Sequence, residues 1–302
     1  MTIAAMFAFV EQGVGHVVGL SDCRLRVQHV IGTISESVAY PFPKVFALGQ
    51  RSLIAIAGET ILPLFAPLES ARLSLANRRR DGGRDSVWTD AMVFYHAAKE
   101  MVHSAHAAPE LDVNPELRTK LKYEALIGGL LSNGRPRVYK LVVNAQSAWL
   151  FRAPLVSDYF LEAIGDPAEA QIVFEAGRDA AVGRLGTSVA SAIWDSSNHA
   201  GVPSTGMGIC VGAVRSDVGE LTWPVVECAG RRFFRGIELP PDAHAQTELP
   251  YDPSVYAAAE RRVSERGAPP NFSRPTLVLD DGPMQIQMPI DEPEELERIL
   301  PD

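Results

Sequence analysis

The hydrophobic pattern at the start of the chain predicts two β-hairpins. One apolar run is followed by turn-type residues at Glu11–Gly15, and a later pair of runs is separated by Gly49–Arg51. Short runs of β-favouring residues bounded by such turns are typical of antiparallel strands. Residues 26–43, between the two pairs, show no clear period. The predicted strands are Thr2–Val10, His16–Leu20, Lys44–Leu48 and Ser52–Ala57.

Helical spacing of apolar residues follows these strands. Pro67 suits the first position of a helix, and the basic triplet Arg78–Arg80 suits its end, where cations complement the helix dipole. Thr89 is the predicted N-cap of a second helix. We expect this helix pair to expose small and apolar residues between Leu68 and Val102 to a neighbouring subunit.

The rest of the pattern alternates between strands and helices. The predicted elements are strands Tyr123–Leu131, Arg137–Val143 and Ala148–Phe151, a helix opened by Asp166 and Pro167, a helix at Arg178–Ser196, and strands Ile209–Val214, Leu221–Glu227 and Arg232–Glu238. Groups of strands that alternate with helix pairs indicate an α+β fold, layered as an αββα sandwich, rather than βαβ units. We expect this domain to span residues 2–238.

From Pro240 onward the composition changes to a proline-rich, acidic extension, residues 239–302. A short helix is predicted at Ser254–Arg266 and a strand at Thr276–Leu279. We expect the extension to pack partly on the domain and its acidic end, Asp291–Asp302, to be a disordered tail.

Composition narrows the classes of partner. The 302 residues carry a formal net charge of −9, which argues against a nucleic-acid partner. No apolar run approaches the roughly 18 residues that span a bilayer, so no membrane partner is expected. The N-terminus has no basic segment typical of a signal peptide. The interpretation that follows is a cytoplasmic protein.

Cysteines and histidines give no pattern typical of a metal site. Cys23, Cys210 and Cys228 are widely separated and lack a CxxC pairing, so buried apolar thiols are expected. His96, His103 and His106 lie on or near the second predicted helix, but no fourth ligand is indicated. We expect neither a metal nor a cofactor.

Four residues in the first part of the chain resemble the opening of proteasome β subunits and the bacterial HslV-type peptidase. They are Thr2 before the first hairpin, Asp22 in LSDCR, Lys44 in KVF, and Gly58 after the strand IAIA. Their order matches that of the family, as does the interval from Lys44 to Gly58. The resemblance covers about residues 2–238. It implies a four-layer αββα sandwich of the N-terminal-nucleophile (Ntn) hydrolase class.

The resemblance also implies a catalytic role for each of the four residues. Loss of Met1 would expose Thr2 as the nucleophile, with its own α-amine as the base. The Lys44 ammonium would favour the ionised hydroxyl, and Asp22 would orient Lys44. The backbone N–H of Gly58 would form the oxyanion hole. Each residue alone also has an ordinary interpretation. Thr2 could be a small second residue and Asp22 a turn residue, while Lys44 could lie at a strand edge and Gly58 could simply end a hairpin.

Differences from the family carry further expectations. The interval from Thr2 to Asp22 is longer than the family's, which predicts an enlarged turn around Glu11–Val14 that leaves Thr2 in place. Lys44 is expected at the rim of a cleft, where its removal would abolish hydrolysis with little loss of fold. Ile56 and Thr60 correspond to pocket positions and indicate a modest apolar pocket.

Three functions remain open at this point. The first is a threonine-type peptidase that assembles into homo-oligomeric rings, as the family implies. The second is a catalytically silent protein of the same fold with a structural or assembly role. The third is a non-proteolytic amide hydrolase that uses the same nucleophile. The sequence does not identify the substrate.

Overall fold

Two six-stranded antiparallel sheets and four α-helices, with two smaller sheets beside them, form the part of the chain that the structure, a computed structural model, describes. The described residues are 3–31, 34–41, 43–58, 62–80, 82–83, 85–107, 122–199, 208–219, 221–228, 230–235, 237–238 and 298–299. The predicted α+β class is confirmed. Thr2, Thr60 and almost all of the extension lie outside the described residues, so the domain boundary at residue 238 stays a prediction.

The first sheet is built around the N-terminal hairpin. In spatial order its strands are β10 (Leu155–Val156), β11 (Tyr159–Gly165), β1 (Ile3–Glu11), β2 (Val14–Asp22), β12 (Ile209–Arg215) and β13 (Leu221–Thr222). Ile3, Ala5 and Phe7 face one side of β1 and Ala4 and Met6 face the other, and all are buried. Because both faces of β1 are buried, its sequence is a continuous apolar run rather than an alternating one.

The second sheet carries the next predicted hairpin. Its strands are β17 (Arg298–Ile299), β9 (Ala148–Arg152), β8 (Pro136–Asn144), β7 (Lys122–Leu130), β6 (Ser52–Gly58) and β5 (Val45–Ala47). β1 and β2 lie against β6, β7 and β8, so the two sheets face each other. A Cβ atom on Gly128 would lie 2.7 Å from Val17 on the opposite sheet, which is too close for any larger residue.

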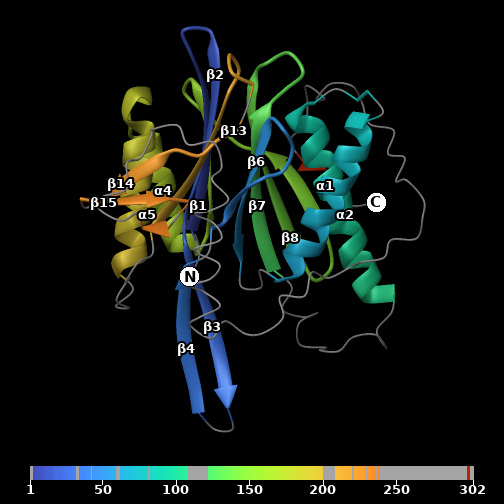
Figure 1. Ribbon diagram of the computed structural model, residues 1–302, viewed down its shortest axis with the longest axis vertical. Helices are drawn as coiled ribbons and strands as arrows, with labels where there is room; N and C mark the ends of the chain where they lie inside the picture. Colours follow the sequence, from blue (N-terminus) through green and yellow to red (C-terminus); the bar gives the residue numbers. More distant parts are fainter. Residues whose placement is uncertain are drawn as a thin grey trace.

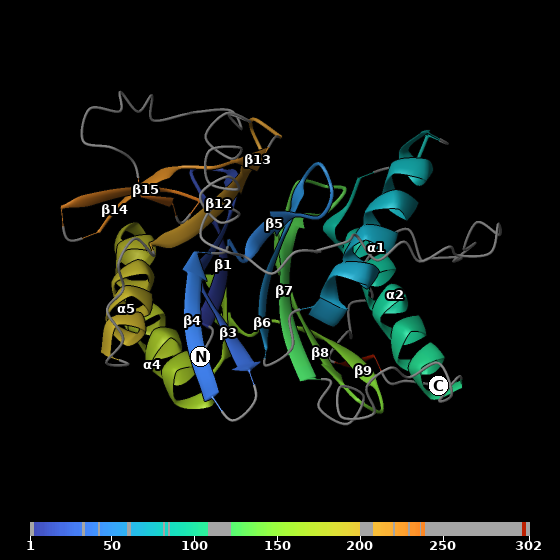
Figure 2. The same ribbon diagram turned by 60° about the horizontal axis from the view of Figure 1, so that its bottom comes forward.

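A helix pair covers the outer side of each sheet (Figures 1 and 2). α1 (Leu62–Arg80) and α2 (Val87–Ala107) pack on the second sheet, and α4 (Pro167–Arg178) and α5 (Leu185–His199) pack on the first. Between the sheets lies a third apolar layer, here called the inter-sheet layer. Its buried members include Ala4, Met6, Val17, Leu53, Leu126 and Val214.

The first helix pair differs from its prediction in start and orientation. α1 begins at Leu62, so Pro67 lies inside it; Pro63 suits the first turn, whereas Pro67 removes one intrahelical hydrogen bond. α2 begins at Val87, so the predicted cap Thr89 lies within it. Leu68 and Val102, the limits of the range expected to expose apolar residues for assembly, are themselves buried against the second sheet. Leu73, by contrast, is 65% exposed.

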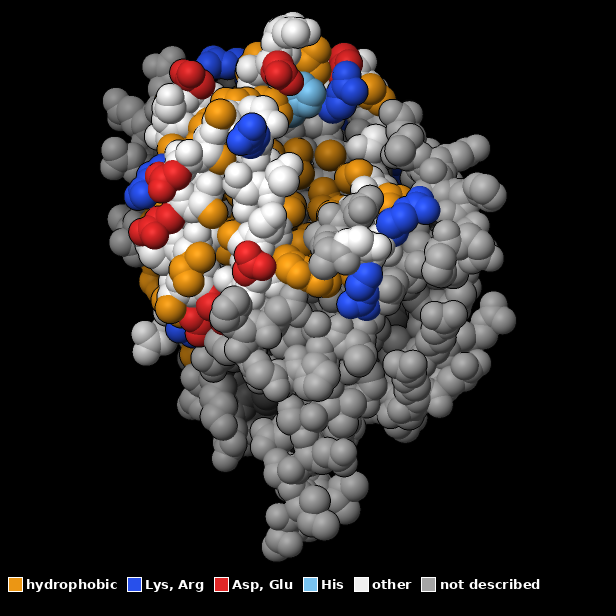
Figure 3. All heavy atoms as spheres, turned by 90° about the vertical axis from the view of Figure 1, so that its left-hand side faces the viewer, with side chains coloured by type: hydrophobic (Ala, Val, Ile, Leu, Met, Phe, Trp, Pro, Cys, Tyr) orange, Lys and Arg blue, Asp and Glu red, His pale blue; other side chains and the backbone are white. Residues whose placement is uncertain are grey.

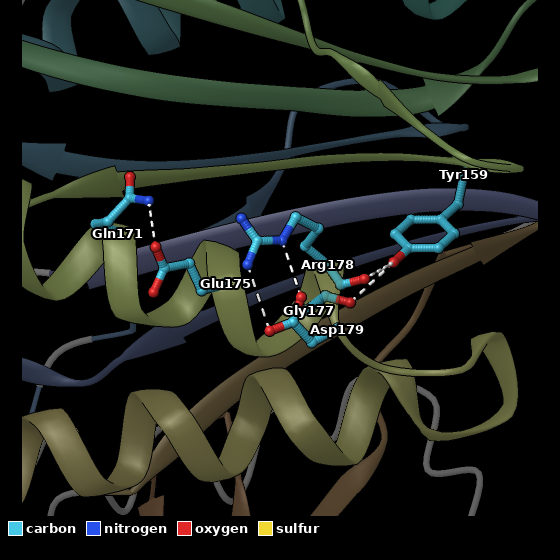
Figure 4. Close-up of polar contacts among 6 residues, drawn as sticks. All are labelled: Tyr159, Gln171, Glu175, Gly177, Arg178 and Asp179. Atoms are coloured by element: carbon cyan, nitrogen blue, oxygen red, sulfur yellow. Dashed lines mark hydrogen bonds and ion pairs between the residues drawn. The ribbon is translucent and has the colours of Figure 1, made fainter.

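Helix α4 follows its sequence signals closely. Asp166 caps it, accepting hydrogen bonds from the N–H groups of Ala168 and Glu169, as the Asp-Pro pair predicts. At its other end the Tyr159 hydroxyl donates to the carbonyls of Gly177 and Arg178 at 2.9 and 3.1 Å (Figure 4). This bond fixes the end of α4 at β11. The next helix, α5, begins at Leu185 rather than at the predicted Arg178, because a 3₁₀ turn at Val182–Arg184 precedes it.

The turn between β1 and β2 contradicts the expected enlargement. Glu11 pairs directly with Val14, which leaves a two-residue turn of Gln12 and Gly13 with φ values of 51° and 81°. Two central residues with positive φ are typical of the tight type I′ turn. The residues between Ile3 and Asp22 therefore lie almost entirely in the two paired strands.

The sequence pattern missed one hairpin, and it predicted two strands at Leu221–Glu227 and Arg232–Glu238 where the structure has four shorter ones. β3 (Arg24–Ile31) and β4 (Ile34–Pro41) form a separate two-stranded hairpin that projects from the sheets (Figure 1). A small sheet of β14 (Val225–Cys228), β15 (Arg231–Phe234) and β16 (Ile237–Glu238) packs beside β12. Arg298 and Ile299 of the extension pair with β9, so this part of the expected disordered tail is attached to a sheet.

The side of the molecule formed by α4 and α5 carries interspersed charged and apolar side chains (Figure 3). Ile172 on α4 is 54% exposed. The described surface is hollowed next to these helices, with apolar side chains around the hollow. The candidate site lies elsewhere, at the end of the inter-sheet layer where β1 begins and β2 ends.

Candidate active site

A buried ion pair joins two of the four residues that the sequence singled out. The Lys44 ammonium donates to both carboxylate oxygens of Asp22, at 2.9 and 2.8 Å. Asp22 is the last residue of β2, and Lys44 immediately precedes β5 in the other sheet. The two side chains are 5% and 0% exposed. The pair therefore links the two sheets at one end of the inter-sheet layer.

The start of β1 is attached to the same carboxylate. The backbone N–H of Ile3 donates to Asp22 Oδ1 at 2.8 Å. Asp22 thus accepts three hydrogen bonds, two of them from a charged donor, which compensates for burying the carboxylate. Thr2, the predicted nucleophile, is bonded covalently to Ile3 but lies outside the described residues. The expected contact between Thr2 and Lys44 therefore stays a prediction.

The burial of Lys44 corrects one expectation. Lys44 is completely buried, not at the rim of a cleft. Removing one partner of a buried ion pair leaves an uncompensated charge, which costs about 3–5 kcal/mol. Replacing Lys44 with alanine would therefore affect the fold as well as any chemistry, and loss of activity in that variant would not identify Lys44 as catalytic.

Gly58 ends β6 in tight contact with the neighbouring strand. A Cβ atom here would lie 2.8 Å from the Lys122 carbonyl oxygen and from Tyr123 Cβ, so only glycine fits without a shift. The N–H of Ile56 donates to the Lys44 carbonyl. Because hydrogen bonds alternate along an antiparallel strand, the N–H of Gly58 leaves β6 on that same side. This direction agrees with the oxyanion-hole role that the resemblance implies for Gly58. The role itself stays a prediction.

Two buried thiols border the ion pair. Cys23 directly follows Asp22, and Cys210 lies on β12, opposite Ser21. Both thiols are free, and they are 2% and 0% exposed, as the cysteine pattern predicted. The structure also brings them together, which their wide separation in sequence did not indicate.

A second charged group lies close to the start of β1. The Lys140 ammonium lies 3.3 Å from Glu124 and 3.5 Å from Glu162, and Glu124 accepts a hydrogen bond from the N–H of Gly165. Gly165 pairs with Ile3. Burial raises the pKa of Glu162 above its usual value, although Lys140 opposes the shift. A signal was available in the sequence, since these are isolated charged residues within apolar strands.

The remaining predicted positions do not join this site. Ile56 is buried in the apolar cluster beneath α1 and α2, and Thr60 lies outside the described residues, so the apolar pocket expected from the two stays a prediction. His96 packs edge-on against Tyr95, and His103 is exposed. Within the described ranges, no group of three or more histidine, cysteine, aspartate or glutamate residues is arranged to hold a metal ion.

The Asp22–Lys44 pair could serve two purposes. As a structural feature it closes the end of the inter-sheet layer and fixes the start of β1. As a chemical feature it holds the Lys44 ammonium on the same carboxylate that accepts the N–H of Ile3, the residue after Thr2. None of the described helices has the length and apolar character needed to cross a membrane. The chain matches no model of a known protein family and no curated protein sequence.

Proposed function

We propose that this protein is an N-terminal-nucleophile amide hydrolase with the four-layer αββα sandwich of proteasome β subunits. The observation that carries the proposal is the buried Asp22 carboxylate, which holds both the Lys44 ammonium and the N–H of Ile3. The facing sheets, each with a helix pair on its outer side, agree with that architecture.

In the proposed mechanism, removal of Met1 exposes the α-amine of Thr2. This amine takes the hydroxyl proton as the oxygen attacks an amide carbonyl, and it returns the proton to the leaving amine. Lys44 stabilises the attacking oxygen electrostatically, while Asp22 holds Lys44 in position. The N–H of Gly58 stabilises the oxyanion. Water then hydrolyses the ester formed with Thr2.

The proposed substrate is a peptide, and the proposed assembly is a homo-oligomeric ring in the cytoplasm. The ring rests mainly on the family resemblance, because many apolar residues of α1 and α2, the helices expected to form its contacts, are buried against the second sheet. Sedimentation at micromolar concentrations gives the mass of the assembly. A species of only 32.8 kDa, the mass of one chain, would contradict a ring while leaving the hydrolase proposal intact.

A matched pair of variants at Thr2 tests the chemistry. Intact-mass analysis should show loss of Met1, and an electrophilic acylating probe such as a β-lactone should add one equivalent to Thr2. Thr2→Ala should abolish labelling and hydrolysis of fluorogenic peptidyl amides, whereas Thr2→Ser should retain part of both. Since all three proteins keep Asp22 and Lys44, equal unfolding midpoints would exclude a folding defect as the cause.

The silent-scaffold alternative is favoured by one specific observation. The Lys44 ammonium and the Ile3 N–H together satisfy Asp22 in a fully buried setting, which is also what a purely structural ion pair requires. Retention of Met1, or labelling that Thr2→Ala leaves unchanged, would favour this alternative. Labelling of Thr2 without cleavage of peptides would instead favour a non-proteolytic amide hydrolase.

A further inference from the structure

Cys23 and Cys210 form a buried thiol pair that the proposed hydrolysis does not use. In the β2–β12 pairing Cys210 lies opposite Ser21 and Ile209 lies opposite Asp22. Cys23 is two positions beyond Ser21, so it lies diagonally across from Cys210 on the same face of the sheet. Both thiols pack within the inter-sheet layer.

The two thiols lie close enough to interact, since each shifts the pKa of the other. Cys210 also donates to the Val45 carbonyl, with a sulfur–oxygen distance of 3.9 Å. A disulfide requires the sulfurs to approach to about 2 Å. Forming it would join two side chains that already share one face of neighbouring strands and one apolar layer.

The surroundings make the two thiols chemically unequal. Burial raises the pKa of Cys210, but the hydrogen bond from Cys23 and the charge of Arg235 oppose this, and the net pKa is lowered. Burial and the neighbouring Cys210 raise the pKa of Cys23 well above its usual value. The thiolate is the reactive form, so Cys210 is the nucleophile and Cys23 is the partner that resolves the intermediate.

We propose that Cys23 and Cys210 are a redox site that a peroxide converts to a reversible intramolecular disulfide. The Cys210 thiolate attacks one peroxide oxygen and breaks the O–O bond, which gives a sulfenic acid and one water. The Cys23 sulfur then attacks the Cys210 sulfur and displaces the second water. Two electrons pass from the two sulfurs to the peroxide, and both thiol protons end in water.

The disulfide would join the residue after Asp22 covalently to β12. It would thereby cross-link the first sheet beside the Asp22–Lys44 pair. The proposal does not depend on hydrolase activity, since it rests on two thiols and their contacts. It would hold equally for a silent scaffold.

The test uses the full-length protein, reduced and then exposed to graded hydrogen peroxide under native conditions. Free thiols are alkylated after denaturation, and peptide mass mapping identifies the linkage. We expect loss of two hydrogen atoms per chain, a peptide linking Cys23 to Cys210, and complete reversal by dithiothreitol. Cys228→Ser is the matched control and should give the same linkage. Cys23→Ser and Cys210→Ser should each abolish it.

Three results would overturn the proposal. The first is a disulfide that involves Cys228 or joins two chains. The second is irreversible sulfinic acid at either cysteine in place of the linkage. The third is recovery of both thiols in the reduced form at peroxide concentrations that fully oxidise free glutathione. Because the wild-type protein carries the primary measurement, a folding defect in either serine variant does not affect the conclusion.

Discussion

Two buried aspartates differ in how their burial is compensated. Asp22, at the end of β2, is paired with the Lys44 ammonium. Asp90, on α2, accepts a hydrogen bond from the hydroxyl of Ser52, the first residue of β6. Asp22 and Asp90 are 4% and 3% exposed. The two sites therefore compare an ionic partner with a neutral one at equal burial.

The neutral partner does not offset the cost of charging Asp90. Burial raises the pKa of Asp90 from 3.8 to about 7, although the Ser52 hydrogen bond and the more distant Arg79 and Arg78 lower it, while Asp85 raises it. At Asp22 a full positive charge lies in direct contact instead. The two sites therefore differ in the partner that contacts the carboxylate, which is a charged ammonium at Asp22 and a neutral hydroxyl at Asp90.

Removing the cation from the ion pair should have the largest effect on stability. Lys44→Met keeps most of the side-chain volume but leaves Asp22 buried without its charged partner. We expect a loss of about 3–5 kcal/mol in the free energy of unfolding at pH 8, measured by urea denaturation. Adding Asp22→Asn should recover part of this loss, because the amide oxygen still accepts the Ile3 N–H without a charge.

Lys140→Met is the control for this comparison. Lys140 also lies between carboxylates, but its side chain is 23% exposed, so water screens the charges that remain. We expect a loss of no more than about 1 kcal/mol. If Lys44→Met lowers the free energy of unfolding no more than Lys140→Met does, the buried ion pair does not stabilise the fold more than the partly exposed one.

The contrast between the two sites also shows what the sequence could predict. Asp22 and Lys44 stand at the ends of apolar strands, in an order that resembles a known family, and their predicted meeting is confirmed. Asp90 lies within a helix, and nothing in the local pattern indicates Ser52 as its partner on a strand 38 residues away. Such contacts depend on how α2 packs on the sheet, which periodicity does not encode.

The same reasoning applies to the fold. Strands β7 and β8 were predictable because their runs are apolar and bounded by the Asn133–Gly134 turn. The β3–β4 hairpin was not, since polar and apolar residues do not alternate regularly throughout residues 24–41. Tertiary packing likewise starts α1 before Pro67, where local propensity favours a later start. Periodicity identifies elements that bury a face, and it misses those that project from the core.

Neutralising Asp90 should have the next largest effect, and the effect should depend on pH. A folded-state pKa raised from 3.8 to about 7 means that stability is full below about pH 4 and falls as the pH rises toward 7. Asp90→Asn removes this titration. At pH 8 we expect the variant to be more stable than wild type by about 4 kcal/mol, since each unit of raised pKa corresponds to about 1.4 kcal/mol. At pH 4 the two should be similar.

Urea denaturation at several pH values between 4 and 8 measures this difference. Asp85→Asn is a suitable control because Asp85 lies nearby but is partly exposed. We expect that variant to keep most of the wild-type slope with pH. An unchanged slope in Asp90→Asn would show that Asp90 is ionised throughout this range, and the contrast with Asp22 would then disappear.

The smallest expected effect is at the hydroxyl partner of Asp90. Ser52→Ala removes the hydrogen bond that lowers the pKa of Asp90 and also the acceptor for the N–H of Gly49, at 2.8 Å. We expect a loss of about 1–2 kcal/mol at pH 5, where Asp90 is protonated. The pKa of Asp90 should rise further above about 7, which carboxyl NMR titration would detect. A pKa that falls in Ser52→Ala would show that the hydroxyl stabilises the protonated acid. Ser52 would then not play even a weak form of the role that a cation such as Lys44 plays beside a carboxylate.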